Sequence, residues 1–322
     1  MTTAYNICLG TAGWGVWHSS DAGASWTRHR APFPLNSRMQ AFAVHPTQPH
    51  TLYAGGDTGL FVSQDGGAHW EKRNTQEDLP TIWSLAIDPI EPTILFAGTR
   101  PAGVYRSQDS GRQWERCSVD IASTCSIGTP FVTSVMVDAD DHHTVWAGVE
   151  IDGVFRSLDG GDTWTHVENG LDDPDIHAMA LVGSQPKRVV ASTARDMFTS
   201  VDQGETWESL SIKEKWPLPY ARGIAVKTDN PGILFSSCGE TTTGETGHIL
   251  RTTDFGTTWE TLNLPMQPNA TIWGFATHPA NGDRILAFSL FGEVYSSEDA
   301  GDSWHKIERE FGEIRAIAWL PN

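Results

Sequence analysis

Residues 84–117 read SLAIDPIEPTILFAGTRPAGVYRSQDSGRQWERC and contain the pattern on which the whole chain is built. An alternating segment rich in small residues is followed by a turn with Pro, a segment that ends in Ala-Gly, and a Gly turn. A third segment, the octad SQDSGRQW and a fourth segment complete the stretch. Segments that are this short and alternating predict β-strands and exclude amphipathic helices. The stretch therefore predicts one four-stranded antiparallel unit.

The octad Ser/Thr-x-Asp-x-Gly-x-x-Trp recurs along the chain. Its seven copies occupy residues 19–26, 63–70, 107–114, 157–164, 200–207, 252–259 and 297–304. Successive octad aspartates are 43 to 52 residues apart. A four-stranded unit that returns with a period of about 46 residues is typical of a propeller blade. We therefore predict an all-β fold, a closed seven-bladed β-propeller formed as a single domain by residues 1–322.

The octad is interpreted as a hairpin turn between the third and fourth strands of each blade. The carboxylate accepts hydrogen bonds from N–H groups of the turn, the hydroxyl is a second local cap, and Gly supplies a positive φ. The Trp begins the next strand and offers a large apolar surface for packing. A catalytic group is needed once, whereas a fold device is needed in every repeat. The octad aspartates are therefore predicted to be structural.

The two ends of the chain complement each other. The N-terminal segment starts at the second strand of a blade, and the C-terminal segment GEIRAIAWLPN, residues 312–322, is a first strand without partners. We expect residues 314–319 to pair with residues 6–9. This pairing closes the ring and completes the first blade, which removes exposed sheet edges.

Composition and charge narrow the classes of partner. The chain is 39% hydrophobic and 19% charged, which excludes intrinsic disorder, and its net charge of -18 disfavours nucleic acid and anionic membranes. It has no apolar run of about 18 residues, no secretory leader pattern, and four cysteines without a CxxC pair. These features predict a soluble cytoplasmic protein with reduced thiols.

Known cofactor and metal motifs are missing from the sequence. The twelve histidines are scattered without an HxH or HExxH pattern, and no Gly-rich phosphate loop or GxSxG elbow is present. We expect no cofactor and no metal site.

The octad is similar to the Asp-box, or bacterial neuraminidase (BNR), repeat, and all seven copies resemble it. Sialidases, xyloglucanases, sortilin-type receptors and photosystem II assembly factors contain this repeat and share blades but not chemistry. The resemblance implies the fold and leaves the activity open. Sialidases are six-bladed and carry an arginine triad with an Arg-Ile-Pro segment that this chain lacks. In outline the chain is most similar to single propellers of the photosystem II assembly factor kind, whose basic patch has no counterpart at this net charge.

The face opposite the octads is predicted to carry the site, because its turns vary most between repeats. Aligning the small residue that opens each inner strand brings the preceding residues into one ring: Gln40, Trp83, Thr133, His177, Arg222, Trp273 and Arg315. A structural position repeats one residue type, as the octad does. This ring instead combines cations, an imidazole, indoles and neutral hydrogen-bonding groups, which suits an asymmetric ligand at the mouth of a central funnel. A solvated rim of unrelated polar residues is the alternative.

Turns between the second and third strands add Arg100, Glu150 and Glu240 as ligand-binding or catalytic candidates. Glu150 borders the blade before His177, so we expect this carboxylate to orient the imidazole and raise its pKa.

Two classes of function follow. The first is a cofactor-independent hydrolase or lyase, or a binding protein, for a small anionic or sugar-like molecule. His177 and Glu150 are its catalytic candidates, and Arg222 and Arg315 hold the anion. The second is a non-catalytic scaffold that binds another protein on a propeller face.

Overall fold

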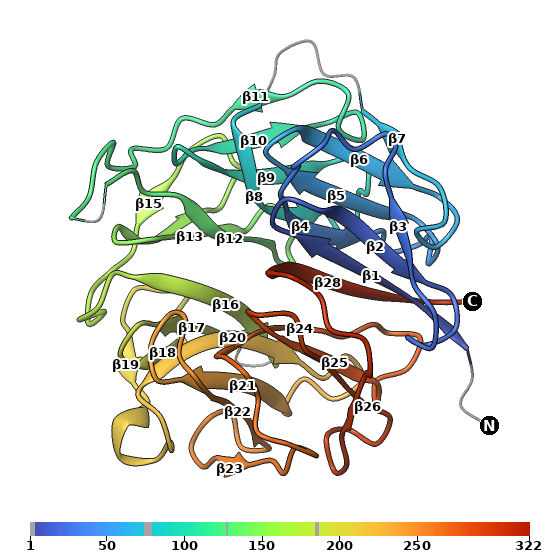
Figure 1. The fold of residues 1–322 in the computed structure, drawn as a ribbon. Helices are drawn as coiled ribbons and strands as arrows, with labels where there is room; N and C mark the ends of the chain where they lie inside the picture. The colour runs from blue at the N-terminus through green and yellow to red at the C-terminus, as the bar shows by residue number, and fades with distance from the viewer. Residues whose placement is uncertain (1–3, 74–78, 127, 184–186) are drawn as a thin grey trace.

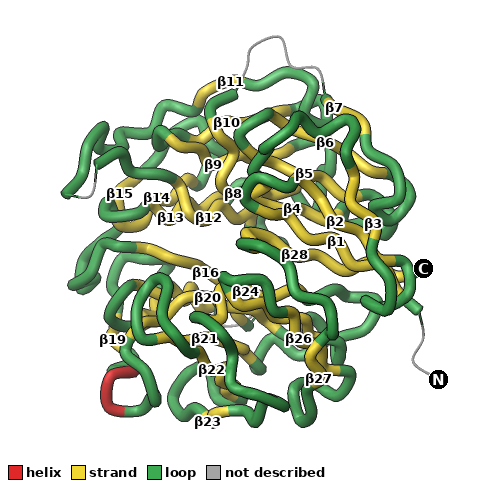
Figure 2. The backbone as a smooth tube through the Cα atoms, in the orientation of Figure 1, coloured by secondary structure: helices red, strands yellow, loops and turns green. Residues whose placement is uncertain are grey.

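The computed structural model describes residues 4–73, 79–126, 128–183 and 187–322. Seven four-stranded antiparallel sheets form blades around a central axis (Figure 1). Each inner strand packs against the inner strands of the two neighbouring blades, and contacts of β28 with β24 and β4 close the ring. The tube in Figure 2 consists almost entirely of strands and connecting loops. The predicted seven-bladed propeller is therefore confirmed.

The strands have the following bounds. The inner strands are β28 (Ile314–Pro321), β4 (Met39–Val44), β8 (Thr81–Ile87), β12 (Val132–Val137), β16 (Ile176–Val182), β20 (Tyr220–Val226) and β24 (Ile272–Ala276). The second strands are β1 (Tyr5–Thr11), β5 (Leu52–Gly56), β9 (Leu95–Arg100), β13 (Val145–Val149), β17 (Arg188–Thr193), β21 (Leu234–Gly239) and β25 (Ile285–Ser289). The third strands are β2 (Gly15–Ser19), β6 (Gly59–Ser63), β10 (Val104–Ser107), β14 (Gly153–Ser157), β18 (Met197–Ser200), β22 (Gly247–Thr252) and β26 (Val294–Ser297). The outer strands are β3 (Thr27–His29), β7 (Glu71–Lys72), β11 (Glu115–Arg116), β15 (Thr165–His166), β19 (Glu208–Ser209), β23 (Glu260–Thr261) and β27 (His305–Lys306), and one 3-10 turn, η1, spans Ile212–Glu214.

The first blade joins the two ends of the chain, as predicted. Its strand order is β28-β1-β2-β3. Asn6 pairs with Leu320, and Leu9 pairs with Ile317. Strand β28 therefore supplies the inner strand that the N-terminal segment lacks.

The octad at residues 157–164 shows how each hairpin turn is held. The Ser157 hydroxyl donates to Asp159 Oδ1 at 2.8 Å and accepts the N–H of Gly161 at 2.8 Å. Asp159 in turn accepts from the N–H of Thr163 at 2.8 Å and from its hydroxyl at 2.6 Å. Gly161 has a φ of 96°, a left-handed conformation that glycine adopts at little cost. The polar groups of the motif thus form hydrogen bonds with one another within the same turn.

The Ala-Gly ending of the second strands allows adjacent blades to approach closely. A Cβ atom at Gly55 would lie 2.5 Å from Ile82 of the next inner strand. The same atom at Gly98 would lie 2.5 Å from Val132. Because these contacts leave no space for a side chain, glycine here is a packing requirement. Apolar clusters between neighbouring sheets form the rest of the core.

Among the residues that the structure describes, no helix has the length and apolar character needed to cross a bilayer.

Candidate functional site

Every inner strand is interrupted near its beginning by a β-bulge. The register shifts lie between Met39 and Ala41, Ile82 and Ser84, Val132 and Ser134, Ile176 and Ala178, Ala221 and Ile224, Ile272 and Gly274, and Ile314 and Ala316. The residues left unpaired are those of the predicted ring, with Gly223 unpaired beside Arg222. A bulge takes a side chain out of the strand's alternation and points it in a new direction. The bulge therefore redirects one side chain per blade at the same place in the fold.

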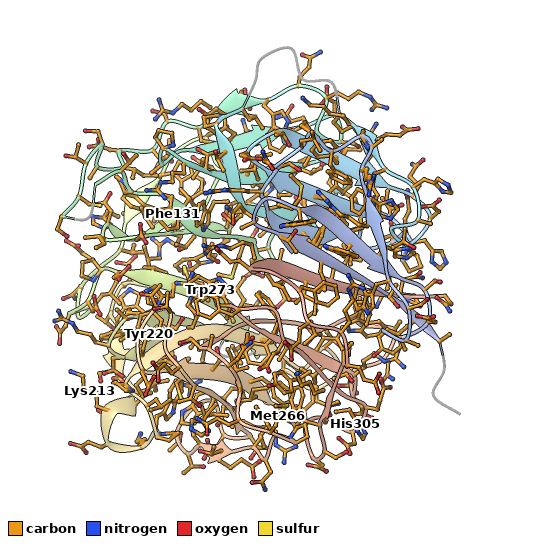
Figure 3. The ribbon with its side chains drawn as sticks, in the orientation of Figure 1. Phe131, Lys213, Tyr220, Met266, Trp273 and His305 are labelled. Atoms are coloured by element: carbon orange, nitrogen blue, oxygen red, sulfur yellow. The ribbon has the colours of Figure 1, made fainter. Side chains whose placement is uncertain are left out.

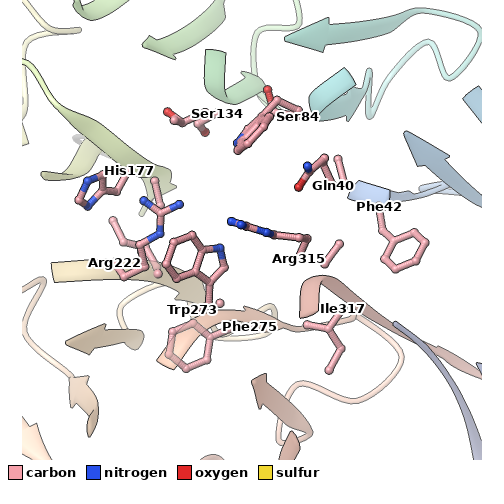
Figure 4. A pocket seen from close by; sticks show the side chains of 18 of the residues that line it. Gln40, Phe42, Ser84, Ser134, His177, Arg222, Trp273, Phe275, Arg315 and Ile317 are labelled. Atoms are coloured by element: carbon pink, nitrogen blue, oxygen red, sulfur yellow. The ribbon is translucent and has the colours of Figure 1, made fainter. Parts of the chain in front are cut away.

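All seven ring residues line one central cavity with a volume of about 290 Å³. The ring residues lie at the beginning of the inner strands, which pairs with the end of the second strands, as Met39 of β4 pairs with Gly56 of β5. The octads follow the end of the third strands, so the cavity lies on the opposite face. In Figure 4 the side chains of Gln40, Arg222 and Arg315 reach into this space beside Trp273. Figure 3 places Trp273 near the middle of the molecule.

Arg222 is the cation at the centre of this arrangement. Its side chain is only 9% exposed, and its Cζ atom lies 3.8 Å from the centroid of the Trp273 indole. Within the described ranges, its guanidinium makes no ion pair and donates no hydrogen bond to a protein acceptor. Burial lowers the pKa of Arg222, and the nearby Arg315 charge lowers it further, against opposing effects of Tyr220, Asp175 and Glu150.

A second guanidinium approaches the same indole. Arg315 Cζ lies 5.2 Å from the Trp273 centroid, and one of its terminal nitrogens pairs with Glu313. Its Nε is buried without a hydrogen-bond partner among the described residues. Two guanidinium groups thus lie against the Trp273 indole. Trp273 is a support for cations in this structure.

His177 lies beside Arg222 with a defined orientation. Its Nδ1 is 2.8 Å from the Ala221 carbonyl oxygen, so in the neutral ring Nδ1 carries the proton and Nε2 the lone pair. Nε2 lies 3.4 Å from Asp175 Oδ2 and 3.5 Å from the Tyr220 hydroxyl. Burial, and then the charge of Arg222, lower the pKa of His177. This direction is opposite to the one that the sequence predicted.

The carboxylate at ion-pair distance from His177 is Asp175 and not Glu150. Our expectation of a Glu150–His177 pair is therefore wrong for this structure. Glu150 is half-buried, and burial together with the Asp175 charge raises its pKa to about 7. Arg222 and Arg100 oppose this rise. Glu150 thus belongs to the same electrostatic cluster without contacting the imidazole.

The other predicted residues divide into structural and peripheral positions. Thr133 donates its hydroxyl to the carbonyl oxygens of Ile176 at 2.7 Å and Gly148 at 3.1 Å, so it joins neighbouring blades. The ring centroids of Trp83 and Phe131 lie 4.1 Å apart. The exposed Arg100 places its guanidinium over both rings.

Glu240 does not belong to the cavity. It is exposed, is absent from the cavity lining, and accepts the backbone N–H of Glu245 at 2.8 Å. Arg100 and Glu150 are also absent from the lining. Over the part of the chain that the structure describes, no group of three metal-ligating side chains converges on one point.

Comparison with protein families finds no family model that matches the chain. A probable oligoxyloglucan-reducing end-specific xyloglucanase of Neosartorya fischeri is 33% identical over 109 residues, which cover 30% of this chain and 13% of that enzyme. Sortilin of Danio rerio is 27% identical over 112 residues, which cover 34% of this chain and 13% of sortilin. The aligned regions therefore span a small fraction of these relatives.

Solved structures show the same fold at low identity. The GH74 xyloglucanase from Xanthomonas campestris superposes with a TM-score of 0.71 at 20% identity, over 95% of this chain and 53% of that enzyme. YCF48 from Cyanidioschyzon merolae gives 0.63 at 14% identity, over 90% of this chain and 97% of that protein. A YCF48 structure with a bound D1 peptide gives 0.58 at 16% identity, over 85% and 83% of the two chains. The chain is a seven-bladed β-propeller whose neighbours are consistent with the superfamily that the octads suggest.

Proposed function

We propose that the central cavity binds a small anionic molecule with a carboxylate group, of the size of a sugar acid. The observation that carries this proposal is the Arg222 guanidinium, which is buried on Trp273 and has no acceptor or acidic partner in the described part of the chain. A buried charge without a partner is costly to a fold. A bound anion would supply the missing partner, so the unpaired guanidinium favours an anion-binding site.

The chemistry of the two guanidinium groups favours a carboxylate. The planar fork of Arg222 has donors spaced to bind both oxygens of a carboxylate. Arg315 adds a second positive charge beside the same indole, and Glu313 neutralises only part of the combined charge. A cavity of about 290 Å³ is at the small end of ligand sites, which favours a single sugar-acid unit over an oligosaccharide.

Acid–base chemistry is the enzymatic extension of this proposal. His177 presents Nε2 to Asp175, and both lie beside the cation that would hold the carboxylate. A base next to a neutralised carboxylate is suited to removing a proton from the adjacent carbon, as a lyase requires, and a general acid serves a hydrolase. The cavity therefore supports elimination or hydrolysis of a small acid without a cofactor.

A protein partner is the second candidate. A YCF48 propeller has been solved with a bound D1 peptide, which favours peptide binding on this kind of fold. A scaffold of this class needs neither a small ligand nor the charge of Arg222 unless its partner covers the cavity.

The test is thermal unfolding of the wild type with acetate, D-gluconate and D-glucuronate, against neutral D-glucose at equal concentration. Stabilisation follows RT ln(1 + [L]/Kd), or about 2.7 kcal/mol at a hundredfold excess over Kd. We expect the anions to stabilise the wild type and Glu240→Gln, but not Arg222→Met. The absence of a shift with every anion would favour the scaffold.

A further inference from the structure

We propose that the cavity takes up its anion together with a proton, which is held by the acidic groups and the imidazole around Arg222. This inference rests on the proposed function and adds a property of the ligand site. The complex therefore gains the equivalent of the neutral acid. The carboxylate contacts Arg222, and the proton resides on a neighbouring side chain of the cavity.

The first support is the geometry of the His177–Asp175 pair. The Nδ1 proton of His177 is used by the Ala221 carbonyl, so a proton gained by the ring is carried on Nε2. Asp175 Oδ2 lies 3.4 Å from Nε2, and the second oxygen, Oδ1, is buried with no hydrogen-bond partner among the described residues. A carboxylate that faces an imidazole lone pair with one oxygen and has its other oxygen unsatisfied is a place where one more proton is stabilised.

The second support is the set of charges that face this pair. Arg222 and Tyr220 approach it from β20, and Glu150 approaches Asp175 from the end of β13. Arg100 acts on Glu150, and Arg315 acts on Arg222. The positive charge of Arg222 therefore lowers the proton affinity of His177 and Glu150 as long as no anion is bound.

An anion on Arg222 reverses this effect. Its charge cancels that of the guanidinium and adds a negative charge beside Asp175 and Glu150. Each change increases the proton affinity of His177 and Glu150, and neither acts in the opposite direction. By linkage, a ligand that causes proton uptake binds more tightly as pH falls.

The experiment measures the Kd of acetate and of D-glucuronate for the full chain between pH 6.5 and 7.5, where both probes stay ionised. We expect Kd to increase at least about threefold over this range, as expected for uptake of about half a proton. Calorimetry at pH 7 in two buffers of different ionisation enthalpy counts the protons directly on the wild type. A Kd that stays constant, with no dependence of the enthalpy on the buffer, overturns the inference.

Variants locate the proton. Asp175→Asn combined with Glu150→Gln keeps side-chain size and removes both carboxylates that lie around His177 and Arg222. We expect the double variant to bind with a Kd that changes less than about 1.5-fold over the same range, while Glu240→Gln, an exposed control, keeps the wild-type dependence. Full dependence in the double variant overturns the assignment of the proton to these two carboxyls. If the double variant does not fold, the buffer experiment on the wild type decides the matter.

The two proposals fail in different ways. If neither probe binds at any pH, the proposed function is contradicted together with this inference. If both probes bind without a dependence on pH, only the proton uptake is contradicted.

Discussion

The Arg222 guanidinium lies 3.8 Å from the centroid of the Trp273 indole, and each residue occupies the bulge of its own inner strand. The indole face offsets part of the lost hydration of the cation, an effect of about 2 kcal/mol in a desolvated site. It does not supply a counter-charge. The fold thus places one buried positive charge at its axis. Asp175 and Glu150 act on it from a distance, but no described carboxylate lies at ion-pair distance from it.

Replacing Arg222 by Met is expected to separate stability from binding. The change removes an unpaired buried charge and keeps an unbranched chain over the indole, so we expect the free energy of unfolding to rise by about 1 kcal/mol or more. Anion binding should be lost. Urea unfolding and the ligand panel measure the two effects.

Arg284 provides the matched contrast, because it is equally buried but forms a two-pronged ion pair with Glu298 and covers Tyr5. Arg284→Met should lower stability by about 1 to 3 kcal/mol, since Glu298 loses its partner. If Arg222→Met is destabilised as strongly as Arg284→Met, Arg222 is a structural residue.

Ser157→Ala tests the interpretation of the octads as fold devices. The change removes the acceptor for the buried Gly161 N–H and the donor to Asp159, which should cost about 1 to 2 kcal/mol. Chemical denaturation of the variant measures this cost. Unchanged stability combined with a loss of ligand binding would show that the octad has a functional role instead.

The loss of stability at acidic pH should be determined by protonation of the octad carboxylates. The hydroxyl and the N–H of Thr163 lower the pKa of Asp159 to about 2, and those of Thr206 lower the pKa of Asp202 to about 2. The pKa is lowered at the octad aspartates of the other repeats as well, Asp21, Asp65, Asp109, Asp254 and Asp299. A folded-state pKa below the ordinary value of 3.8 contributes stability that is present above that value and lost as pH falls toward 2. We therefore expect the urea midpoint to decrease below about pH 4, and a midpoint that is unchanged between pH 4 and 2.5 would contradict this.

Deleting residues 312–322 should destroy cooperative unfolding. The deletion removes β28 and with it Trp319, which is 1% exposed and packs against Tyr5 and His278. The edge of β1 and the core of the first blade would be left uncovered. Differential scanning calorimetry measures the loss. A transition of wild-type sharpness and midpoint would show that closure by β28 is not needed.

The repeat explains why so much of the site was predictable from sequence. Once the octads fix the register of each blade, the residue before the small opening residue falls at the same place seven times, and all these positions line the cavity. The turns between the second and third strands lack such a register. Glu240 lies in the longest of these turns, where it caps the Glu245 N–H instead of reaching the axis.

Asp175 was missed for a different reason. It lies outside the ring position, on the segment that leads into β16. Residues two apart on an extended chain share a face, so its spacing from His177 was a usable signal. The burial of Arg222 had no such signal, because it depends on how Trp273 and the neighbouring blades pack around it.

The most direct test of an anion site at the axis is a crystal structure of the protein grown or soaked with D-glucuronate at saturating concentration. We expect density in the central cavity with the carboxylate within hydrogen-bond distance of the Arg222 guanidinium, beside Trp273 and Arg315. An empty cavity in crystals that hold the ligand elsewhere, or a ligand whose carboxylate points away from Arg222, would contradict it.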